Sequence, residues 1–489
     1  MAALVQLVPR ALAGFALLVV AACSGVNPAT GRQSFTLFMS PSEEARVGAQ
    51  EHAKILDHFG GVYDDPAIGG YIATVGGRVA ANSELPNARF FFTVLNTPEV
   101  NAFALPGGYV YVTRGLIALT NSEAELAGVL AHEVGHVAAR HTAERYSRAV
   151  VAGLGAAILG AITNDQIGQL ADIGSELYLL GFSREQEFQA DTLGVRYLRS
   201  TGYAPSAMAS FLRTIEAEKN LTAQLARIDP GQLSGGFFST HPRNLDRVAR
   251  AIGEAGGADG VVRREGHLEK LAGLIFGDDP SQGVVRGREY AHPDLGFRFV
   301  VPPGFHLINT SEAVLARDDS GGAMVFDSAG RQTHPDPLTY LRDIWADGAR
   351  LSDLERIEIN GMDAATGTTR LRGRVGDYRG PLDARFVVIE FGGRQIYRFQ
   401  FLSPPNRTAA LREGFERTTF SFRRLSAVEA ARIEPLTVEL LRVGRGDTPA
   451  SLAAGLPFDE LRTERFLVLN GLAAGQPLDP GALVKIIAE

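Results

Sequence analysis

The sequence has one cysteine, Cys23, among 489 residues, so no intramolecular disulfide can form. It also lacks runs of lysine and arginine, and its net charge is -7 with a pI of about 5.9. This charge balance gives no basis for a nucleic-acid-binding surface, and we expect no nucleic acid partner. Beyond residue 22 there is no apolar run of the roughly 18 residues that a membrane-spanning helix needs.

The composition is typical of folded globular domains. Apolar residues make up 45% of the chain and charged residues 21%, which argues against disorder. Domains usually contain about 100–200 residues, so a chain of this length is expected to form about two to four of them.

The first 22 residues have the features of an export signal. Arg10 supplies a positive charge, and residues 11–22 are uncharged and apolar and end in small residues. The run 20–23, Val-Ala-Ala-Cys, resembles the lipobox of bacterial lipoproteins, which implies cleavage before Cys23, its acylation and stable anchoring in a membrane. Ser24 follows, where an Asp would have suggested the inner membrane, so we expect the outer membrane, facing the periplasm. The alternative is an ordinary secretory peptide with a chance cysteine.

Helical spacing of apolar residues predicts helices, and aromatic and β-branched runs predict strands. The predicted helices are 41–60, 66–82, one that opens at Ser122, 183–200, 205–219 and 242–255, and the predicted strands include 89–96 and 109–113. Residues 149–162 are apolar and too short to cross a bilayer, and we interpret them as a buried or mobile helix.

The segment His132-Glu133-Val134-Gly135-His136 lies within the helix that opens at Ser122. Positions i and i+4 share one face of a helix, so both imidazoles can bind one metal ion. Glu133 lies beside the first histidine and can take a proton from a water at the open coordination position. Zinc suits histidine and carboxylate ligands, whereas hard metals prefer oxygen cages. The alternative is a helix with two partly exposed histidines.

A catalytic zinc needs a third protein ligand. Ala139 and Thr142 exclude the extended pattern in which a third histidine follows the first two. A carboxylate from a later helix is the other source. Glu187 and Asp191 share one helical face, so Glu187 can bind the metal while Asp191 orients a ligand histidine. Glu185 is a rival ligand, and a charged, solvated helix face is the alternative to a site.

Several motifs together resemble the gluzincin family that contains HtpX, BepA and the CAAX prenyl proteases. They are residues 101–108, 112–116, 132–136, Arg140-His141, Glu187 with Ala190-Asp191, and Thr240-His241-Pro242 with Arg247. Their order and spacing match over about residues 40–255, roughly half of the chain. Some members are integral membrane enzymes, but the absence of a later long apolar segment resembles the soluble periplasmic branch.

The resemblance implies one zinc ion per chain, bound by His132, His136 and Glu187, with Glu133 as the general base. It also implies that a strand lines the cleft and pairs with the backbone of an extended polypeptide substrate, as in other cases of strand addition. The residues expected in that strand are Tyr109, Val110, Tyr111 and Val112.

Two further histidines require an interpretation. His241 lies in the family's His-Pro motif near the metal, where the resemblance implies that it stabilises the oxyanion or binds the zinc in a resting form. The alternative is a residue at a helix start before Pro242. His141 lies nine positions after His132, and we predict a structural role for it rather than metal binding.

The chain changes character after the peptidase-like part. Residues 285–425 are rich in strand-like runs with one helix around 336–350, and their start resembles the α/β sandwich of PsbP-type lumenal proteins. We predict that Trp345 belongs to the core of this domain. Residues 433–489 resemble a LysM module, a βααβ unit that often binds N-acetylglucosamine polymers such as peptidoglycan.

The sequence therefore predicts an α+β multidomain protein. Its expected parts are a lipoprotein signal peptide (1–22), a tether (23–40), a mainly helical zincin peptidase domain with a small sheet (41–275), an α+β domain (285–425) and a LysM-like domain (433–489). The expected function is a zinc endopeptidase, lipid-anchored in the cell envelope, that degrades misfolded or misassembled envelope proteins. The alternative is a peptidoglycan-associated scaffold or chaperone-like lipoprotein with a closed or structural zinc site.

Overall fold

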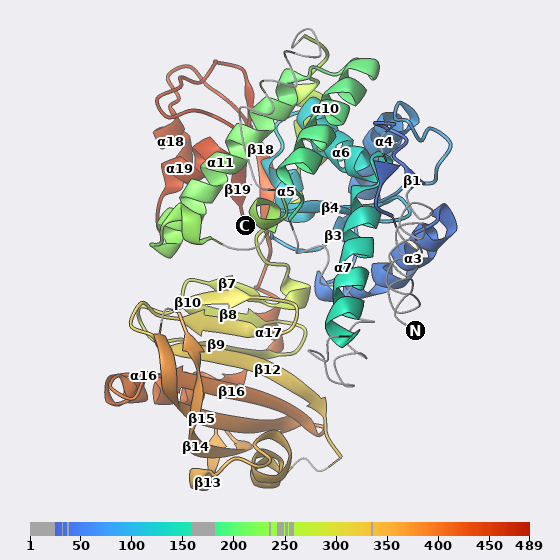
Figure 1. Cartoon of the computed structure of the whole chain (residues 1–489). Helices are drawn as coiled ribbons and strands as arrows, with labels where there is room; N and C mark the ends of the chain where they lie inside the picture. Colours follow the sequence, from blue (N-terminus) through green and yellow to red (C-terminus); the bar gives the residue numbers. More distant parts are fainter. Residues whose placement is uncertain are drawn as a thin grey trace, which may run out of the picture. The chain divides into compact units, whose positions relative to one another are not determined.

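The computed structural model describes residues 25–158 and 181–489, apart from residues 32, 37–38, 234–235, 242–248, 250–252, 254–258, 334–335 and 377. The predicted signal peptide, Cys23, Pro242, Arg247 and most of the predicted helix 242–255 lie outside the described residues. The chain divides into two compact units (Figure 1). The first contains residues up to Gly277 together with Leu436–Glu489, and the second is Asp278–Pro435. Both contain helices and sheets, which confirms the α+β class.

The first described elements are β1 (Gly25–Val26), β2 (Gln33–Ser34), α3 (Pro41–His58) and α4 (Pro66–Ala81). The two helices confirm those predicted at 41–60 and 66–82. Each has a proline in its first turn and a capping side chain, Ser40 for α3 and Asp65 for α4. Both features stabilise a helix start, because proline needs no hydrogen bond there and the cap satisfies free N–H groups.

A three-stranded sheet follows, formed by β3 (Phe91–Leu95), β4 (Ala102–Leu105) and β5 (Tyr109–Thr113). β5 lies in the centre, parallel to β3 and antiparallel to β4. The turn between β4 and β5 contains Gly107 and Gly108, and a Cβ at Gly108 would lie 2.2 Å from the carbonyl oxygen of Arg89. Glycine is therefore required there. β3 and β4 are the two edge strands, and within the described residues the outer edge of β4 pairs with no strand.

The helices of the first unit that carry or surround the metal motif are α5 (Arg114–Leu119), α6 (Glu123–Ala138), α7 (His141–Ile158), α10 (Arg184–Ser200), α11 (Ser206–Ala226), the short η3 (Pro230–Gln232) and α12 (Gly236–Thr240). α6 is buried from Ala124 to Ala138 and lies against α10. A Cβ at Gly135 would lie 3.1 Å from the carbonyl oxygen of Ala190. A Cβ at Gly194 would lie 3.2 Å from the backbone nitrogen of His132, so small residues bring the two helices together.

The C-terminal residues belong to the same unit as α6. The elements are α14 (Arg264–Leu271), β6 (Ile275–Phe276), β18 (Leu436–Arg442), α18 (Pro449–Ala453), α19 (Arg462–Leu469) and β19 (Leu483–Ala488). β18 pairs with both β19 and β6, and its apolar side chains join the core that contains α4, α6 and α11. Lys485 is fully buried, and its Nζ donates to the carbonyl oxygens of Ala118 (2.6 Å) and Thr120 (2.8 Å). Residues 436–489 thus contain the predicted strand–helix–helix–strand order and share one core with the peptidase-like part.

The second unit is built from two antiparallel sheets. The smaller has the order β17-β9-β8-β7, with β7 (Val284–Arg286), β8 (Glu289–His292), β9 (Phe297–Val300) and β17 (Arg423–Arg424). The larger has the order β10-β11-β12-β16-β15-β14-β13, with β10 (His306–Asn309), β11 (Val314–Arg317), β12 (Ala323–Arg331), β13 (Ser352–Ile359), β14 (Met362–Val375), β15 (Tyr378–Gly392) and β16 (Gln395–Ser403).

Short helices complete the second unit: η4 (Pro280–Gln282), α15 (Pro337–Tyr340), the π-turn η5 (Leu341–Trp345), α16 (Thr408–Ser421) and α17 (Ala427–Ala430). The predicted helix around 336–350 is therefore present but shorter. Trp345 is partly buried and packs edge-on against Phe386 of the core, with 4.8 Å between ring centroids.

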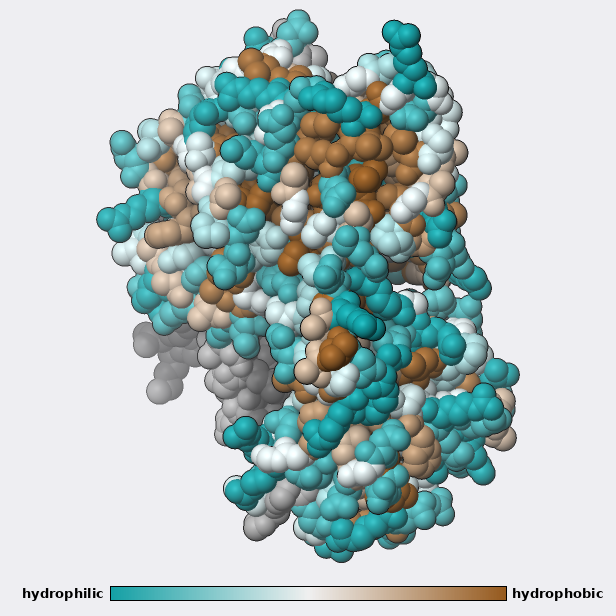
Figure 2. Space-filling model, turned by 180° about the vertical axis from the view of Figure 1, so that it is seen from behind, coloured by the Kyte–Doolittle hydropathy of each residue, from teal (hydrophilic) through white to brown (hydrophobic). Residues whose placement is uncertain are grey.

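The surface of the first unit carries an apolar area on the face shown in Figure 2, whereas the second unit is mainly hydrophilic in that view. The first unit's exposed large apolar side chains include Val62, Phe91, Val261 and Val262. Apolar areas of this kind are typical of contact surfaces. In the described parts of the chain, no helix combines the length and the apolar character needed to cross a bilayer.

The buried lysine provides a test of whether residues 436–489 fold with the peptidase-like part. We expect Lys485→Met to lower the free energy of unfolding of the whole first unit by about 3 kcal/mol, because two buried carbonyl groups lose their hydrogen-bond donor. Chemical denaturation followed by circular dichroism measures this. The control is Lys270→Met at an exposed position of α14, which should change stability by less than about 0.5 kcal/mol. An independent C-terminal domain would instead unfold in a separate transition, leaving that of α6 unchanged.

Candidate metal centre

α6 supplies two imidazoles and one carboxylate to the site. Ser122 caps the helix by accepting a hydrogen bond from the N–H of Glu125, and acidic residues lie in the first turn. His132 and His136 project on one side of the helix, one turn apart. Both are buried, as is Glu133 between them. The partly exposed histidines of the alternative interpretation are therefore not observed.

α10 supplies the carboxylate that reaches the two imidazoles. A capping box between Ser183 and Gln186 starts the helix, which places Glu187 in its first turn. Glu187 is fully buried and faces α6, whereas Glu185 is exposed and accepts a hydrogen bond from Gln189. The structure thus brings Glu187, rather than the rival Glu185, to the histidines.

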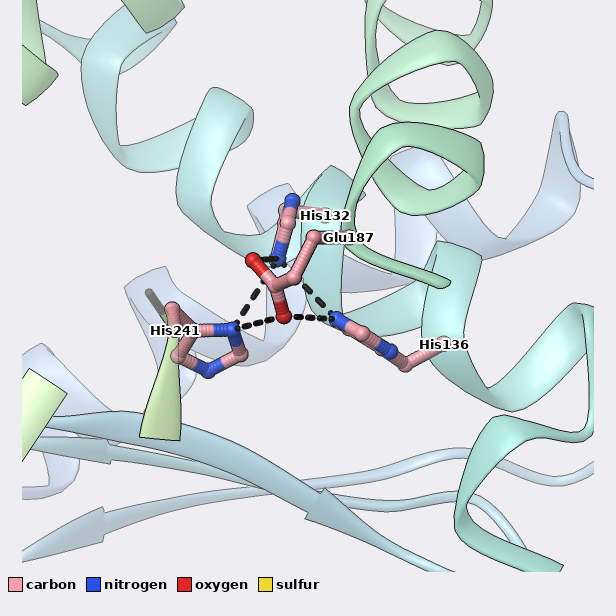
Figure 3. A group of neighbouring side chains, drawn as sticks. All are labelled: His132, His136, Glu187 and His241. Atoms are coloured by element: carbon pink, nitrogen blue, oxygen red, sulfur yellow. Dashed lines mark hydrogen bonds and ion pairs between the residues drawn. The ribbon is translucent and has the colours of Figure 1, made fainter. Parts of the chain in front are cut away.

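Four donor groups converge on one point, those of His132, His136, Glu187 and His241, and all four residues are buried (Figure 3). The Nε2 atoms of His132 and His136 are 3.0 Å apart. Glu187 Oε1 lies 3.4 Å from Nε2 of His136, and Oε2 lies 3.8 Å from Nε2 of His132. The corners of a zinc tetrahedron with bonds of about 2.0–2.1 Å are separated by about 3.3 Å, so these residues fit a zinc ion.

His241 occupies the fourth corner of this group. It follows α12 directly, and its Nδ1 lies 3.0 Å from Glu187 Oε1 and 3.2 Å from His132 Nε2. Its other ring nitrogen, Nε2, is 3.4 Å from Glu133 Oε1 and 3.4 Å from the carbonyl oxygen of Ala102 in β4. His241 therefore contacts the metal ligands, the predicted base and the edge strand at once. In this arrangement the chain itself provides all four donors.

Glu133 has the surroundings expected of a general base. Its side chain is fully buried, and neither carboxylate oxygen has a hydrogen-bond partner within the described residues. Burial raises the pKa of Glu133, while the nearby imidazoles of His241 and His132 oppose that rise. Burial also opposes ionisation of Glu187, but contacts with His241 and His136 outweigh it and hold the pKa of Glu187 well below its usual value. The two carboxylates are thus tuned in opposite directions, which suits one base and one ligand.

A second layer of hydrogen bonds orients the ligand imidazoles. Asp191 Oδ1 lies 3.0 Å from Nδ1 of His132, as the spacing of Glu187 and Asp191 predicts. His141 Nδ1 lies 3.0 Å from Nδ1 of His136, and its Nε2 lies 3.1 Å from Gln189 Oε1. His141 therefore contacts the back of a ligand, away from the convergence point. Burial lowers the pKa of His141 to about 4, so its ring is neutral near pH 7.

The sequence interpretation missed an aromatic residue next to the ligands. Phe182 is buried and stacks on the ring of His136 with 3.8 Å between centroids, and the guanidinium of Arg145 lies 4.1 Å from the centre of the Phe182 ring. Phe182 precedes α10 by two residues and its N–H donates to Thr240. The only sequence signal was its position immediately before a capped helix. Of the apolar segment 149–162, interpreted from the sequence as a buried or mobile helix, residues 149–158 belong to α7 and residues 159–162 lie outside the described residues.

The position of the substrate-pairing strand requires a correction. Tyr109, Val110, Tyr111 and Val112 lie in β5, whose two edges are already paired with β3 and β4. They cannot add a substrate strand without losing one of these partners. Of the two edge strands, β4 is the one whose Ala102 contacts His241. The N–H of Thr113 donates to the carbonyl of Asn101, and by the alternation of an antiparallel pair the backbone groups of Ala102 and Ala104 point away from β5.

An apolar pocket adjoins the metal group. Besides the donor residues His132, Glu187 and His241 and the orienting Asp191, it is lined by Gly128, Val129, Met208, Phe211, Leu212 and Phe237. Its walls come from α6 and α11 and from the residues before His241. Such a combination of apolar walls and convergent polar groups is typical of a binding site.

The orienting carboxylate gives a test of the centre. We expect Asp191→Asn to weaken zinc binding by about 10–100-fold, because the N–H of His132 then meets an uncharged and weaker acceptor than the carboxylate. Glu185→Gln on the same helix is the matched control and should bind zinc as the unmodified protein does. Competition with a fluorescent zinc chelator measures both. Equal affinities in the two variants would contradict the assigned arrangement.

Comparison with known protein families matches residues 66–255 to Peptidase family M48. The beta-barrel assembly-enhancing protease of Yersinia pestis is 34% identical over 202 residues, covering 39% of this chain and 40% of that protein. The mitochondrial metalloendopeptidase OMA1 of Schizosaccharomyces pombe is 30% identical over 231 residues, covering 46% of this chain and 64% of that protein. The chain thus spans about two fifths of the length of the bacterial relative it matches.

Among solved structures, cyanobacterial PsbP (CyanoP) from Synechocystis sp. PCC 6803 matches with a TM-score of 0.22 and 16% identity, over 29% of this chain and 98% of that one. A crystal structure from Bacteroides thetaiotaomicron VPI-5482 matches with a TM-score of 0.23 and 11% identity, over 35% of this chain and 57% of that one.

The family match and the geometry agree on the same residues. The matched range contains both helices of the site, and the buried group of three histidines and one glutamate fits the zinc that this family uses. Residues 66–255 thus match Peptidase family M48, and they contain the buried metal-binding group that a zinc metallopeptidase requires.

Proposed function

We propose that this chain is a zinc endopeptidase of the bacterial cell envelope, held at a membrane by acylation of Cys23 and acting on misfolded or misassembled envelope proteins. The observation that carries the catalytic part is the convergence of His132, His136 and Glu187 beside a buried Glu133 with no hydrogen-bond partner in the described chain. A structural zinc site needs four ligands but has no use for such a carboxylate.

In this proposal each residue has a defined task. Zinc, when bound, polarises the scissile carbonyl and makes a water more acidic. Glu133 takes the proton of the attacking water and passes it to the leaving amine, which the raised pKa of its carboxyl favours. The backbone groups of Ala102 and Ala104 hold the substrate as an added strand.

The position of His241 adds a resting state to this scheme. Its Nδ1 fills the corner that a substrate or water must use, so the site has to release His241 before it can act. Once released, the ring remains close enough to stabilise the developing oxyanion. We therefore assign His241 first to closing the site.

The proposed envelope location and substrate class are supported by the sequence around Cys23 and by the bacterial relative. Cys23 follows a lipobox-like sequence, and the bacterial relative is described as an enhancer of beta-barrel assembly. Membrane anchoring would bring this chain close to its proposed substrates, polypeptides of the outer membrane. Peptidoglycan binding by residues 433–489 is a further part of the proposal, supported by their strand–helix–helix–strand order.

A second candidate function is a scaffold or chaperone-like lipoprotein whose zinc site stays closed. The occupation of the fourth corner by His241 is the observation that favours it. Both candidates predict bound zinc, and they differ in whether Glu133 has a role.

Glu133→Gln tests the catalytic assignment. We expect casein cleavage to fall at least about 100-fold, because glutamine cannot take the proton from the attacking water, while zinc binding is retained. A chelator should abolish cleavage by the unmodified protein, and added zinc should restore it. Glu185→Gln is the control and should keep full activity. Equal activity of the Glu133 variant and the unmodified protein would refute this mechanism.

His241→Ala tests the resting state. Removal of the fourth donor should weaken zinc binding and raise the kcat for a short peptide several-fold, because the closing group is gone. Competition with a fluorescent chelator measures zinc affinity, and kcat is measured on the same preparation at saturating zinc. A lower kcat at unchanged KM would instead assign His241 to oxyanion stabilisation.

A further inference from the structure

The segment that follows the predicted anchor is docked on the catalytic helix. Asn27 is buried, and its Nδ2 donates a 2.7 Å hydrogen bond to the carbonyl oxygen of Ala139, the residue that ends α6. Its Oδ1 accepts from the N–H groups of Ala29 and Thr30, which fixes the side chain in a tight turn. The carbonyl groups at the end of a helix have no partner within the helix. Asn27 satisfies one of them.

The neighbouring residues strengthen this docking. β1 pairs with β2 through Gly25 and Val26, and the turn between them is closed by the N–H of Gly31 on the carbonyl of Asn27. Ala29 packs against the main core, and Ser34 and Thr36 are buried. Part of the predicted tether of residues 23–40 is therefore docked on the peptidase domain, through Asn27 and Ala29.

A second contact fixes the end of the same segment. The guanidinium of Arg140, which follows α6, donates to the carbonyl oxygen of Met39 and to Glu44 in α3. Met39 is buried with Val47 and Ala143. The segment from Gly25 to Met39 thus contacts the end of α6 and the start of α7 at both of its ends.

This docking sets how far the metal centre can lie from residue 23. Asn27 lies four positions after Cys23, and an extended chain covers at most about 14 Å over that distance. Ala139 lies three residues beyond His136, a rise of about 4.5 Å along α6. With the side chains included, the metal centre lies within about 35 Å of Cys23. A free tether of residues 23–40 would by itself span up to about 60 Å.

We propose that the substrates of this enzyme are polypeptide segments close to the membrane surface, because the docked segment keeps the metal centre within about 35 Å of the lipid headgroups. This inference rests on the proposed function, including acylation of Cys23. A short link between the lipid anchor and the metal centre raises the effective concentration of the site near the membrane surface. A substrate segment that lies farther from the surface than this link can reach is cleaved more slowly. The selectivity comes from height above the bilayer rather than from sequence.

The experiment uses the full-length acylated protein in vesicles of phosphatidylethanolamine and phosphatidylglycerol. Reporter peptides are coupled to a maleimide lipid through helical spacers of about 10 or about 60 residues, which hold the same cleavable segment roughly 15 or 90 Å above the surface. We expect the near reporter to be cleaved at least tenfold faster than the far one.

Two insertions separate docking from simple tethering. A Gly/Ser linker of about 30 residues between Ser24 and Gly25 lies before the docked segment, and it should reduce the near-to-far ratio below about threefold. The same linker between Thr36 and Met39 lies behind Asn27 and should leave the ratio at ten or more. A free tether would lose the preference equally with either insertion, and that result would overturn the proposal.

Three controls keep the outcomes distinct. Soluble casein should be cleaved at the same rate by all three proteins, and no cleavage by any of them would refute the proposed function itself. Flotation of the vesicles should show that each protein is retained, whereas Cys23→Ser should not be. If the unmodified protein does not float with the vesicles, it is not anchored, and this inference is refuted. Equal cleavage of near and far reporters by a retained, active protein would refute the inference alone.

Discussion

The close approach of α6 and α10 is the constraint on which the rest of the first unit depends. Two imidazoles on one helix cannot hold a catalytic zinc without a third donor, and the carboxylate of Glu187 comes from the other helix. The helices meet at Gly135, Ala190 and Gly194, where added side-chain atoms would collide with backbone. A larger residue at this contact would move Glu187 and Asp191 together, since both lie on the same face of α10. Metal binding therefore requires the close packing of α6 and α10.

Segments from both ends of the chain hold α6 in place. At its end, Asn27 binds the carbonyl of Ala139, and before its start Lys485 binds the carbonyl groups of Ala118 and Thr120. The buried Glu125 accepts from the N–H of Asn121 and the hydroxyl of Ser210, which ties the first turn to α11. A catalytic helix buried along its whole length gains precision in this way, because it has no mobile end.

The sequence could predict the elements of the site that are local. His132 to His136 and the pair Glu187 and Asp191 follow helical periodicity, and the structure places all of them around one point. The substrate strand could not be predicted, because residue spacing does not reveal which strand of a sheet lies at the edge. The contacts of Asn27 with Ala139 and of Lys485 with Ala118 could not be predicted either, because each joins residues more than 100 positions apart. The π-turn after α15 likewise shortened a helix whose apolar spacing suggested residues 336–350.

The edge strand and the closing histidine contact each other, and this suggests how a substrate could open the site. His241 Nε2 lies 3.4 Å from the carbonyl oxygen of Ala102, one of the groups that points away from β5. A substrate strand added to β4 would offer its own N–H to that oxygen. The two donors compete for one acceptor, so strand addition would remove a contact that holds His241. The Nδ1 atom on the same ring would then leave the metal corner more easily. In this proposal the polypeptide that is to be cleaved also releases the group that keeps the zinc closed.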